Sequence, residues 1–145
     1  MQLEDDPLAV LGRPYALVRS EISGTEPESV SEIREEGEPE ELFAEAPDGR
    51  WQCMLDAHGK VESIFLFGDK GCRFPLNLRP GMSVAEVQAE IGEPPTRSKP
   101  ERTVPGLSWA GAFLRWDKPT YCVHAEFGRD GGLRQLTFMV PRRAP

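Results

Sequence analysis

Hydrophobic and polar residues alternate along two stretches of the chain, and each stretch is interrupted by a glycine-containing turn. The first predicts strands over 51–55 and 61–67 around an Asp-Ala-His-Gly turn. The second predicts strands over 121–127 and 133–140 around an Arg-Asp-Gly-Gly turn. Asp-Gly or Gly-Gly between such alternating runs is a strong hairpin signal. We therefore expect two antiparallel hairpins, with a further strand over 111–117 before the second.

A helical spacing of apolar residues separates the two hairpins, in the segment LRPGMSVAEVQAEIGEPPTR. Ser83 and Glu86 form an S-x-x-E capping box, Gly92 provides a left-handed stop, and two prolines follow. These signals predict a helix over about 84–91. A helix of two turns is unstable alone in water, so its Val and Ile side chains should pack against the sheet.

Two segments of the chain, PLAVLGRPYA and AEIGEPPTR, share a helix tail followed by [Leu/Ile]-Gly-x-Pro, and each precedes a hairpin. The two hairpins also match in their apolar positions. We expect a single domain over 1–145 that contains two degenerate helix–loop–hairpin units, about 1–70 and 76–140. The alternative is that similar turn chemistry arose independently in the two halves.

The helix and its flanks resemble a known family pattern: Gly-Met-[Ser/Thr], a Glu-Val helix, [Leu/Ile]-Gly-x-Pro and a hairpin. This is the small α/β unit shared by the outer-membrane assembly lipoprotein BamE (SmpA/OmlA) and the β-lactamase inhibitory protein (BLIP), which fuses two such units. The matching residues are Gly81, Met82, Ser83, Glu86, Val87, Gly92 and Pro94 in the second unit, and Leu11, Gly12 and Pro14 in the first. The resemblance implies a BamE/BLIP-like α+β fold with short helices packed on an antiparallel sheet.

Two features of these families are not found in the sequence. BamE-like lipoproteins carry a signal peptide and a lipidated cysteine, and the secreted inhibitors carry an export signal and disulfides. This chain begins MQLEDDPLAV and has three cysteines without C-x-x-C spacing, which favours a reducing, cytoplasmic compartment. It is similar instead to the acidic immunity proteins found beside bacterial polymorphic toxins, several of which carry an IFLFG strand before the helix. The residues in that arrangement are Phe65, Leu66, Phe67 and Gly68, then Leu78, Gly81, Met82 and Ser83.

Charge is distributed unevenly along the chain, whose formal net charge is −7. Residues 1–50 hold 14 acidic residues against 4 arginines, and residues 51–145 hold 10 acidic residues against 13 basic ones. Such a chain repels nucleic acid and anionic lipid and favours a basic partner. No apolar stretch reaches the ~20 residues that span a bilayer. We therefore expect neither a nucleic-acid partner nor a membrane.

The segment 25–49 concentrates this negative charge, with ten acidic residues and one arginine. Its low hydrophobicity predicts a loop that is mobile when free, inserted in the first unit. It is either a solubilising loop or a segment that clasps a basic cleft by charge complementarity. Trp109, in a loop-rich stretch, is either an aromatic anchor for a partner or an ordinary core residue. The candidate partner-binding residues are Glu32, Glu35, Glu36, Glu38, Glu40, Glu41 and Trp109.

Residues suited to catalysis or metal binding are few. His58 lies in a predicted turn and His124 on a predicted strand, and the three cysteines do not cluster as zinc ligands. Cys72 reads as the most exposed thiol, although a loop cysteine is more often structural than nucleophilic. We expect no enzyme, no cofactor and no metal. A hydrolase that uses Cys72 or His124 is a minor alternative.

The favoured interpretation is an immunity protein that binds a cognate bacterial toxin, or another basic protein, and blocks it by stoichiometric occlusion. A nuclease toxin fits the charge best, because its cleft must be basic to hold phosphates. The alternative is a non-enzymatic BamE-like module for protein binding or assembly, unrelated to toxins. In both cases the helix supports the sheet, and function is expected on the other face of the sheet and its loops.

Overall fold

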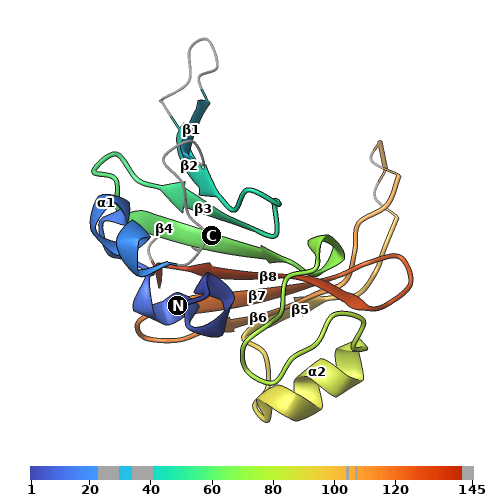
Figure 1. Ribbon diagram of the computed structural model, residues 1–145. Helices are drawn as coiled ribbons and strands as arrows, with labels where there is room; N and C mark the ends of the chain where they lie inside the picture. Colours follow the sequence, from blue (N-terminus) through green and yellow to red (C-terminus); the bar gives the residue numbers. More distant parts are fainter. Residues whose placement is uncertain (23–29, 34–40, 104, 107, 142–145) are drawn as a thin grey trace.

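One antiparallel sheet dominates the computed structural model, which describes residues 1–22, 30–33, 41–103, 105–106 and 108–141 (Figure 1). Within these residues the sheet has eight strands in the order β1-β2-β3-β4-β8-β7-β6-β5. The fold is therefore α+β, as predicted. The strands are β1 (Val30–Ile33), β2 (Glu41–Glu45), β3 (Trp51–Leu55), β4 (Val61–Phe67), β5 (Arg97–Lys99), β6 (Phe113–Asp117), β7 (Cys122–Phe127) and β8 (Leu133–Met139).

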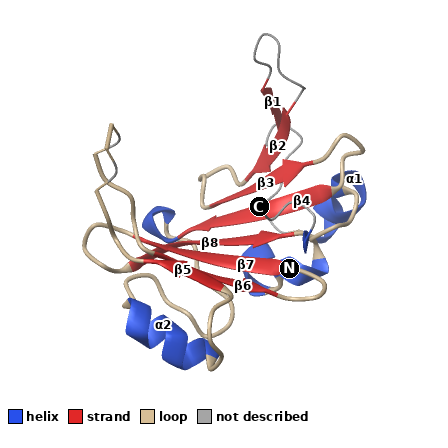
Figure 2. Ribbon diagram, turned by 180° about the vertical axis from the view of Figure 1, so that it is seen from behind, coloured by secondary structure: helices blue, strands red, loops and turns tan. Residues whose placement is uncertain are grey.

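The helical segments are short and lie at two places along the sheet. Figures 1 and 2 show α1 beside β4 and α2 beside β5 and β6. The N–H of Val61 donates to the carbonyl of Arg13, which ties the N-terminal segment to β4. The α-helices are α1 (Tyr15–Val18) and α2 (Val84–Ile91), and 3-10 turns cover Leu3–Asp5, Pro7–Ala9, Arg19–Glu21 and Gly68–Lys70.

The sheet consists of two four-stranded meanders. Strands β1 to β4 follow one another across one half, and β5 to β8 across the other. The last strands of the two meanders, β4 and β8, pair with Ile64 opposite Phe138 and Leu66 opposite Leu136. The two halves therefore contain the same order of elements, a helix followed by four strands. That they derive from a repeat in the sequence stays a prediction.

The predicted hairpins are confirmed. β3 and β4 have the predicted bounds, and β7 and β8 lie within one residue of them, whereas the strand before β7 begins at Phe113. At the β3–β4 turn the Asp56 carboxylate accepts the N–H groups of His58 and Lys60, at 2.8 and 3.0 Å. Gly59 in the same turn has φ +76°. An acceptor side chain and a positive-φ glycine together close the turn.

Helix α2 begins and ends where the sequence predicts. The Ser83 hydroxyl accepts the N–H of Glu86 at 3.1 Å, and the Glu86 carboxylate accepts the N–H of Ser83 at 3.1 Å, so the capping box is complete. Gly92 follows the helix with φ +78°. Val87 on the inner side of the helix is fully buried. The helix is a packing element.

The core lies on one face of the sheet. Alternate side chains of the central strands are fully buried there, and the buried residues of the N-terminal segment and of α2 belong to the same cluster. Burying side chains of this size stabilises the fold by roughly 1.5–3 kcal/mol each. The cluster includes Leu3, Val10, Val18, Trp51, Ile64, Val87, Trp116, Leu136 and Phe138.

The acidic segment differs from the expectation of a loop. Val30–Ile33 and Glu41–Glu45 are strands, and β2 pairs with β3 so that Ala44, which is fully buried, lies opposite Cys53. Pairing with a neighbouring strand supplies backbone hydrogen bonds that composition does not reveal, which is why the prediction was wrong here. The rest of the segment before residue 41, namely 25–29 and 34–40, lies outside the described residues.

Candidate protein-binding face

The face of the sheet opposite the core carries aromatic and charged side chains, and we call it the open face. Successive side chains of a strand point to opposite faces. Phe65 thus points away from the core, because its neighbours Ile64 and Leu66 are fully buried in it. The strand register places the following residues on the open face: Phe43, Glu45, Gln52, Met54, Ser63, Phe65, Phe67, Arg97, Lys99, Phe113, Arg115, Asp117, Cys122, His124, Glu126, Gln135, Thr137 and Met139.

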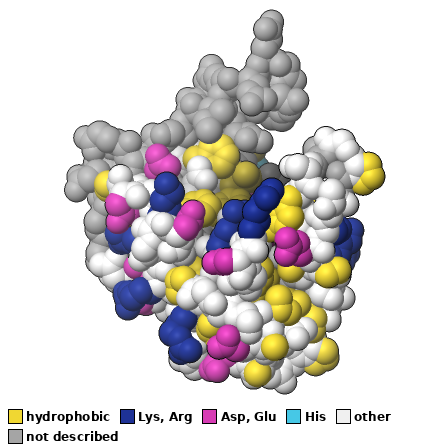
Figure 3. Space-filling model, turned by 90° about the vertical axis from the view of Figure 1, so that its right-hand side faces the viewer, with side chains coloured by type: hydrophobic (Ala, Val, Ile, Leu, Met, Phe, Trp, Pro, Cys, Tyr) yellow, Lys and Arg dark blue, Asp and Glu magenta, His cyan; other side chains and the backbone are white. Residues whose placement is uncertain are grey.

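Four half-buried phenylalanines lie on the open face. The rings of Phe65 and Phe67 on β4 lie 6.4 Å apart and are nearly parallel, with an interplanar angle of 7°. Phe43 lies two strands away on β2, and Phe113 lies on β6. Figure 3 shows hydrophobic side chains beside Lys and Arg side chains around a hollow at one end of the molecule. Rings held in this way bury a large area at a small cost in side-chain entropy when a partner covers them.

Strands β6 and β7 add a charged pair to the open face. His124 Nε2 lies 3.4 Å from Glu126 Oε1, and the His124 ring stacks on Phe113 with 4.8 Å between the ring centroids. The hydrogen bond from His124 lowers the pKa of the Glu126 carboxyl against the opposing effect of burial. A ring, an imidazole and a carboxylate are therefore held together in one orientation.

Arg115 is the buried cation of the open face, with 4 % of its surface exposed. Its Nε donates to the Asp117 carboxylate at 2.9 Å, and a terminal guanidinium nitrogen lies 3.9 Å from the Cys122 sulfur. Hydrogen bonds from the Cys122 thiol and from Arg115 hold the pKa of Asp117 below its usual value. Removing Asp117 would leave the buried guanidinium of Arg115 without its carboxylate partner, which is strongly destabilising. The Arg115–Asp117 pair therefore stabilises this part of the open face.

The chemistry of the open face suits the recognition of another protein. It combines apolar area with charge pairs that fix orientation, as protein interfaces do. Burial raises the pKa of the Cys122 thiol, which opposes a nucleophilic thiolate. In the part of the chain that the structure describes, no three or more His, Cys, Asp and Glu side chains gather to hold a metal ion.

Cys72 is not an exposed thiol, and that prediction was wrong. The side chain is 2 % exposed, and burial raises the pKa of its thiol to about 12. Its Sγ donates to the carbonyl of Arg73 at 3.2 Å. The neighbouring Gly71 has φ +85°, so the chain turns sharply and directs Cys72 inward. A flanking glycine and arginine in the sequence do not reveal this turn.

Trp109 packs against its own chain. Its indole N–H donates to the Glu101 carboxylate, and the Arg129 guanidinium carbon lies 4.9 Å from the ring centroid. A Cβ at Gly111 would lie 2.6 Å from the Phe127 carbonyl oxygen and 3.0 Å from the indole, so glycine is needed at that position. The side chain is half-buried. Its role as an anchor for a partner stays a prediction.

The acidic candidate residues are only partly within the described residues. Glu32 and Glu41 lie on β1 and β2, where the backbone pairs Glu32 with Leu42 and Glu41 with Ile33. Glu35, Glu36, Glu38 and Glu40 lie outside the described residues. Their contact with a partner stays a prediction.

The open-face phenylalanines are not among the candidate residues from the sequence. In a strand that is covered on one face, outward positions are usually polar. The run Ile64, Phe65, Leu66 and Phe67 instead has aromatic residues at outward positions between buried aliphatic ones. This departure from alternation is the signal that indicates a second contact surface on β4.

No family model, curated protein or solved structure matches the chain. Among the described residues, no helix has the length and apolar character needed to cross a membrane. The class of the site therefore rests on its geometry.

Proposed function

We propose that this protein is a protein-binding inhibitor of the BamE/BLIP-like fold that acts as a cytoplasmic immunity protein. It binds a cognate bacterial toxin and neutralises it by stoichiometric occlusion. The observation that carries the proposal is the open face, where Phe113 stacks on His124 of the His124–Glu126 pair and the half-buried Phe65 and Phe67 lie two strands away on β4. This combination of apolar area and ordered charge is what protein recognition requires.

Charge favours a basic partner. Residues 1–50 carry a formal net charge of −10, from 14 acidic residues and 4 arginines. Such a field accelerates encounter with a basic protein and weakens as salt is added. A nuclease toxin satisfies this requirement, because the cleft that holds its phosphates is basic.

The test has a binding step and a growth step. The immobilised protein captures partners from lysate and secretome of the source cells at low and at high salt, and a variant with glutamine at 35, 36, 38 and 40 is treated in parallel. The captured protein is then expressed alone and together with wild type. We expect one basic protein, bound more weakly at high salt and by the variant, that arrests growth alone and is tolerated when co-expressed.

Other results contradict the proposal in distinct ways. A captured protein that is harmless alone would favour an assembly module unrelated to toxins. A partner that binds equally well at low and high salt, and equally well to the glutamine variant, would contradict the electrostatic part of the proposal. Inhibition that persists at a large excess of partner would exclude stoichiometric occlusion.

A further inference from the structure

Strand β5 forms a free edge of the sheet. It is the last strand in the sheet order, and its three residues, Arg97, Ser98 and Lys99, are all exposed. An edge strand presents N–H and C=O groups that can pair with an added strand. Prolines at 95 and 100 bracket β5, and the N–H of Thr96 already donates to the carbonyl of Arg115 at 2.7 Å, so N–H groups suited to pairing are confined to residues 97–99. The edge is therefore short, and an added strand can pair with it in only a few registers.

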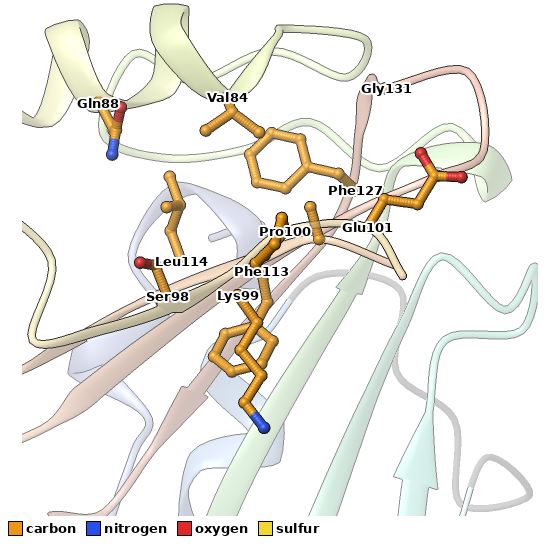
Figure 4. A pocket seen from close by; sticks show the side chains of 12 residues that line it. Val84, Gln88, Ser98, Lys99, Pro100, Glu101, Phe113, Leu114, Phe127 and Gly131 are labelled. Atoms are coloured by element: carbon orange, nitrogen blue, oxygen red, sulfur yellow. The ribbon is translucent and has the colours of Figure 1, made fainter. Parts of the chain in front are cut away.

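A cavity of about 440 Å³ opens beside this edge, between α2 and strands β5 and β6. In Figure 4, Val84 and Gln88 on α2 face Ser98 and Leu114, and the Phe127 ring lies next to Val84. Leu114 and Phe127 are buried, and Val84 is half-buried. The walls are thus mainly apolar, and the volume lies in the range of ligand pockets, roughly 300–1,000 Å³.

The two faces of β5 differ in chemistry. Ser98 lies opposite Leu114 and lines the cavity. Arg97 and Lys99 lie opposite Arg115 and Phe113 on the open face, and Lys99 and Phe113 also border the cavity. Lys99 makes no ion pair with any described residue, and Figure 4 shows its side chain extending away from Val84. A strand added to this edge would place one side chain in the cavity and its two neighbours next to basic residues.

We propose that β5 is a docking edge for an extended acidic peptide segment of a partner protein. The segment adds a ninth strand, inserts an apolar side chain between α2 and β6, and directs acidic side chains toward Arg97 and Lys99. This interaction uses strand β5 and the cavity beside it; it shares Phe113 with the open face but does not involve Phe65 or Phe67. Because its test uses only this protein and synthetic peptides, the outcome does not depend on whether the protein binds a toxin.

The test is a titration of the ¹⁵N-labelled protein with three peptides, followed by amide chemical shifts. The probe is acetyl-Thr-Thr-Glu-Leu-Glu-Thr-Thr-amide. One control replaces Leu by Ser, and the other replaces both Glu by Lys. We expect saturable shifts of residues 84–88, 96–99 and 112–114 with the probe, and weaker binding of both controls, because one loses the apolar contact and the other reverses the charge.

Three single substitutions locate the site. Lys99→Glu should weaken probe binding about two- to fivefold, the range for an exposed ion pair. Lys60→Glu makes the same charge change at an exposed residue of the β3–β4 turn and should have no effect. Val84→Phe places a larger side chain in the cavity and should reduce the preference for Leu over Ser, while the amide spectrum verifies that the fold is kept.

The proposal is overturned if the Ser or Lys peptide binds as well as the probe, or if the shifts map away from β5 and α2. It is also overturned if Lys60→Glu weakens binding as much as Lys99→Glu, since that would show non-specific charge attraction. A concentration-dependent dimer that Lys99→Glu abolishes would assign the edge to a second copy of the chain instead.

Discussion

At the scale of single residues, the Glu126 carboxyl on the open face makes the stability of the fold depend on pH. The side chains of His124 and Glu126 lie on one strand, 3.4 Å apart, and His124 lowers the pKa of Glu126. A carboxyl with a lowered pKa in the folded state stabilises the fold above its unfolded pKa, and this contribution is lost as the pH falls through the folded pKa. The relevant window lies below the ordinary value of 4.5.

Glu126→Gln should therefore reduce the free energy of unfolding at pH 6 and have little effect at pH 3. The Glu126 side chain is 38 % exposed, so solvent screening limits the difference to less than about 1 kcal/mol. Urea unfolding at both pH values measures it, with Glu90→Gln, an exposed carboxyl on α2, as the control. An equal effect of Glu126→Gln at pH 3 and pH 6 would contradict a lowered pKa of Glu126 in the folded state.

The three cysteines give a second prediction at this scale. Cys53, Cys72 and Cys122 are each at most 2 % exposed, and burial raises the pKa of all three thiols. An aromatic disulfide reagent at pH 8 should therefore react slowly with native protein and rapidly with three thiols in urea, because the thiolate is the reactive form. Fast labelling of one thiol in native protein would contradict the buried position of that cysteine.

At the scale of elements, α2 depends on its first turn. The helix has eight residues, too few for stability on propensity alone, and the capping box satisfies two backbone N–H groups at its start. Its end at Gly92 borders the loop that leads to the edge strand β5. Loosening α2 should therefore affect both the core and the cavity beside β5.

Ser83→Ala should lower the free energy of unfolding by about 1 kcal/mol, the usual cost of losing an N-cap side chain. Urea unfolding measures the change. Ser108→Ala, at an exposed serine outside the helices, is the matched control and should be close to neutral. Equal stability of Ser83→Ala and the control would show that the cap does not support the helix.

The elements also differ in how far the sequence predicts them. β3 and β4 follow from alternation and a turn with an acceptor side chain, both of which are local. β5 has three exposed residues between prolines, and β1 and β2 lie in an acidic stretch, so none of them shows a local signal. These strands depend on pairing with a neighbour, which is a tertiary effect.

At the scale of the whole molecule, one core joins the two meanders. β4 and β8 pair in register at the centre of the sheet, and residues from both halves share one buried cluster. Trp51 lies in the first meander and Trp116 in the second, and both are at most 2 % exposed. A continuous core of this size predicts that the halves unfold together.

Two single-tryptophan variants test this cooperativity, both with Trp109→Phe, and with either Trp51→Phe or Trp116→Phe. In each variant the urea midpoint from fluorescence should equal the midpoint from far-UV circular dichroism, because each remaining tryptophan reports on one half and dichroism on both. Comparing the two probes within one variant removes any difference in stability between variants. Separate midpoints would mean that the halves unfold independently.

The candidate site could be predicted from the sequence only in outline. Alternation of side chains implies that the sheet has a second face, and the helix signals imply that one face is covered. Which residues meet on the open face depends on the order of the strands: Phe65 and His124 both lie opposite Thr137, from strands more than 50 residues apart. No local pattern encodes that neighbourhood.

The central claim is that the open face binds the partner, and calorimetric titration of the captured partner into the protein tests it most directly. Wild type, Phe65→Ala and Leu17→Ala are compared, since Leu17 is a 66 % exposed apolar residue on α1. We predict one partner per chain, a loss of roughly 30-fold in affinity for Phe65→Ala, as for a hot-spot residue of about 2 kcal/mol, and no change for Leu17→Ala. Unchanged affinity of Phe65→Ala, or an equal loss for Leu17→Ala, would contradict the account.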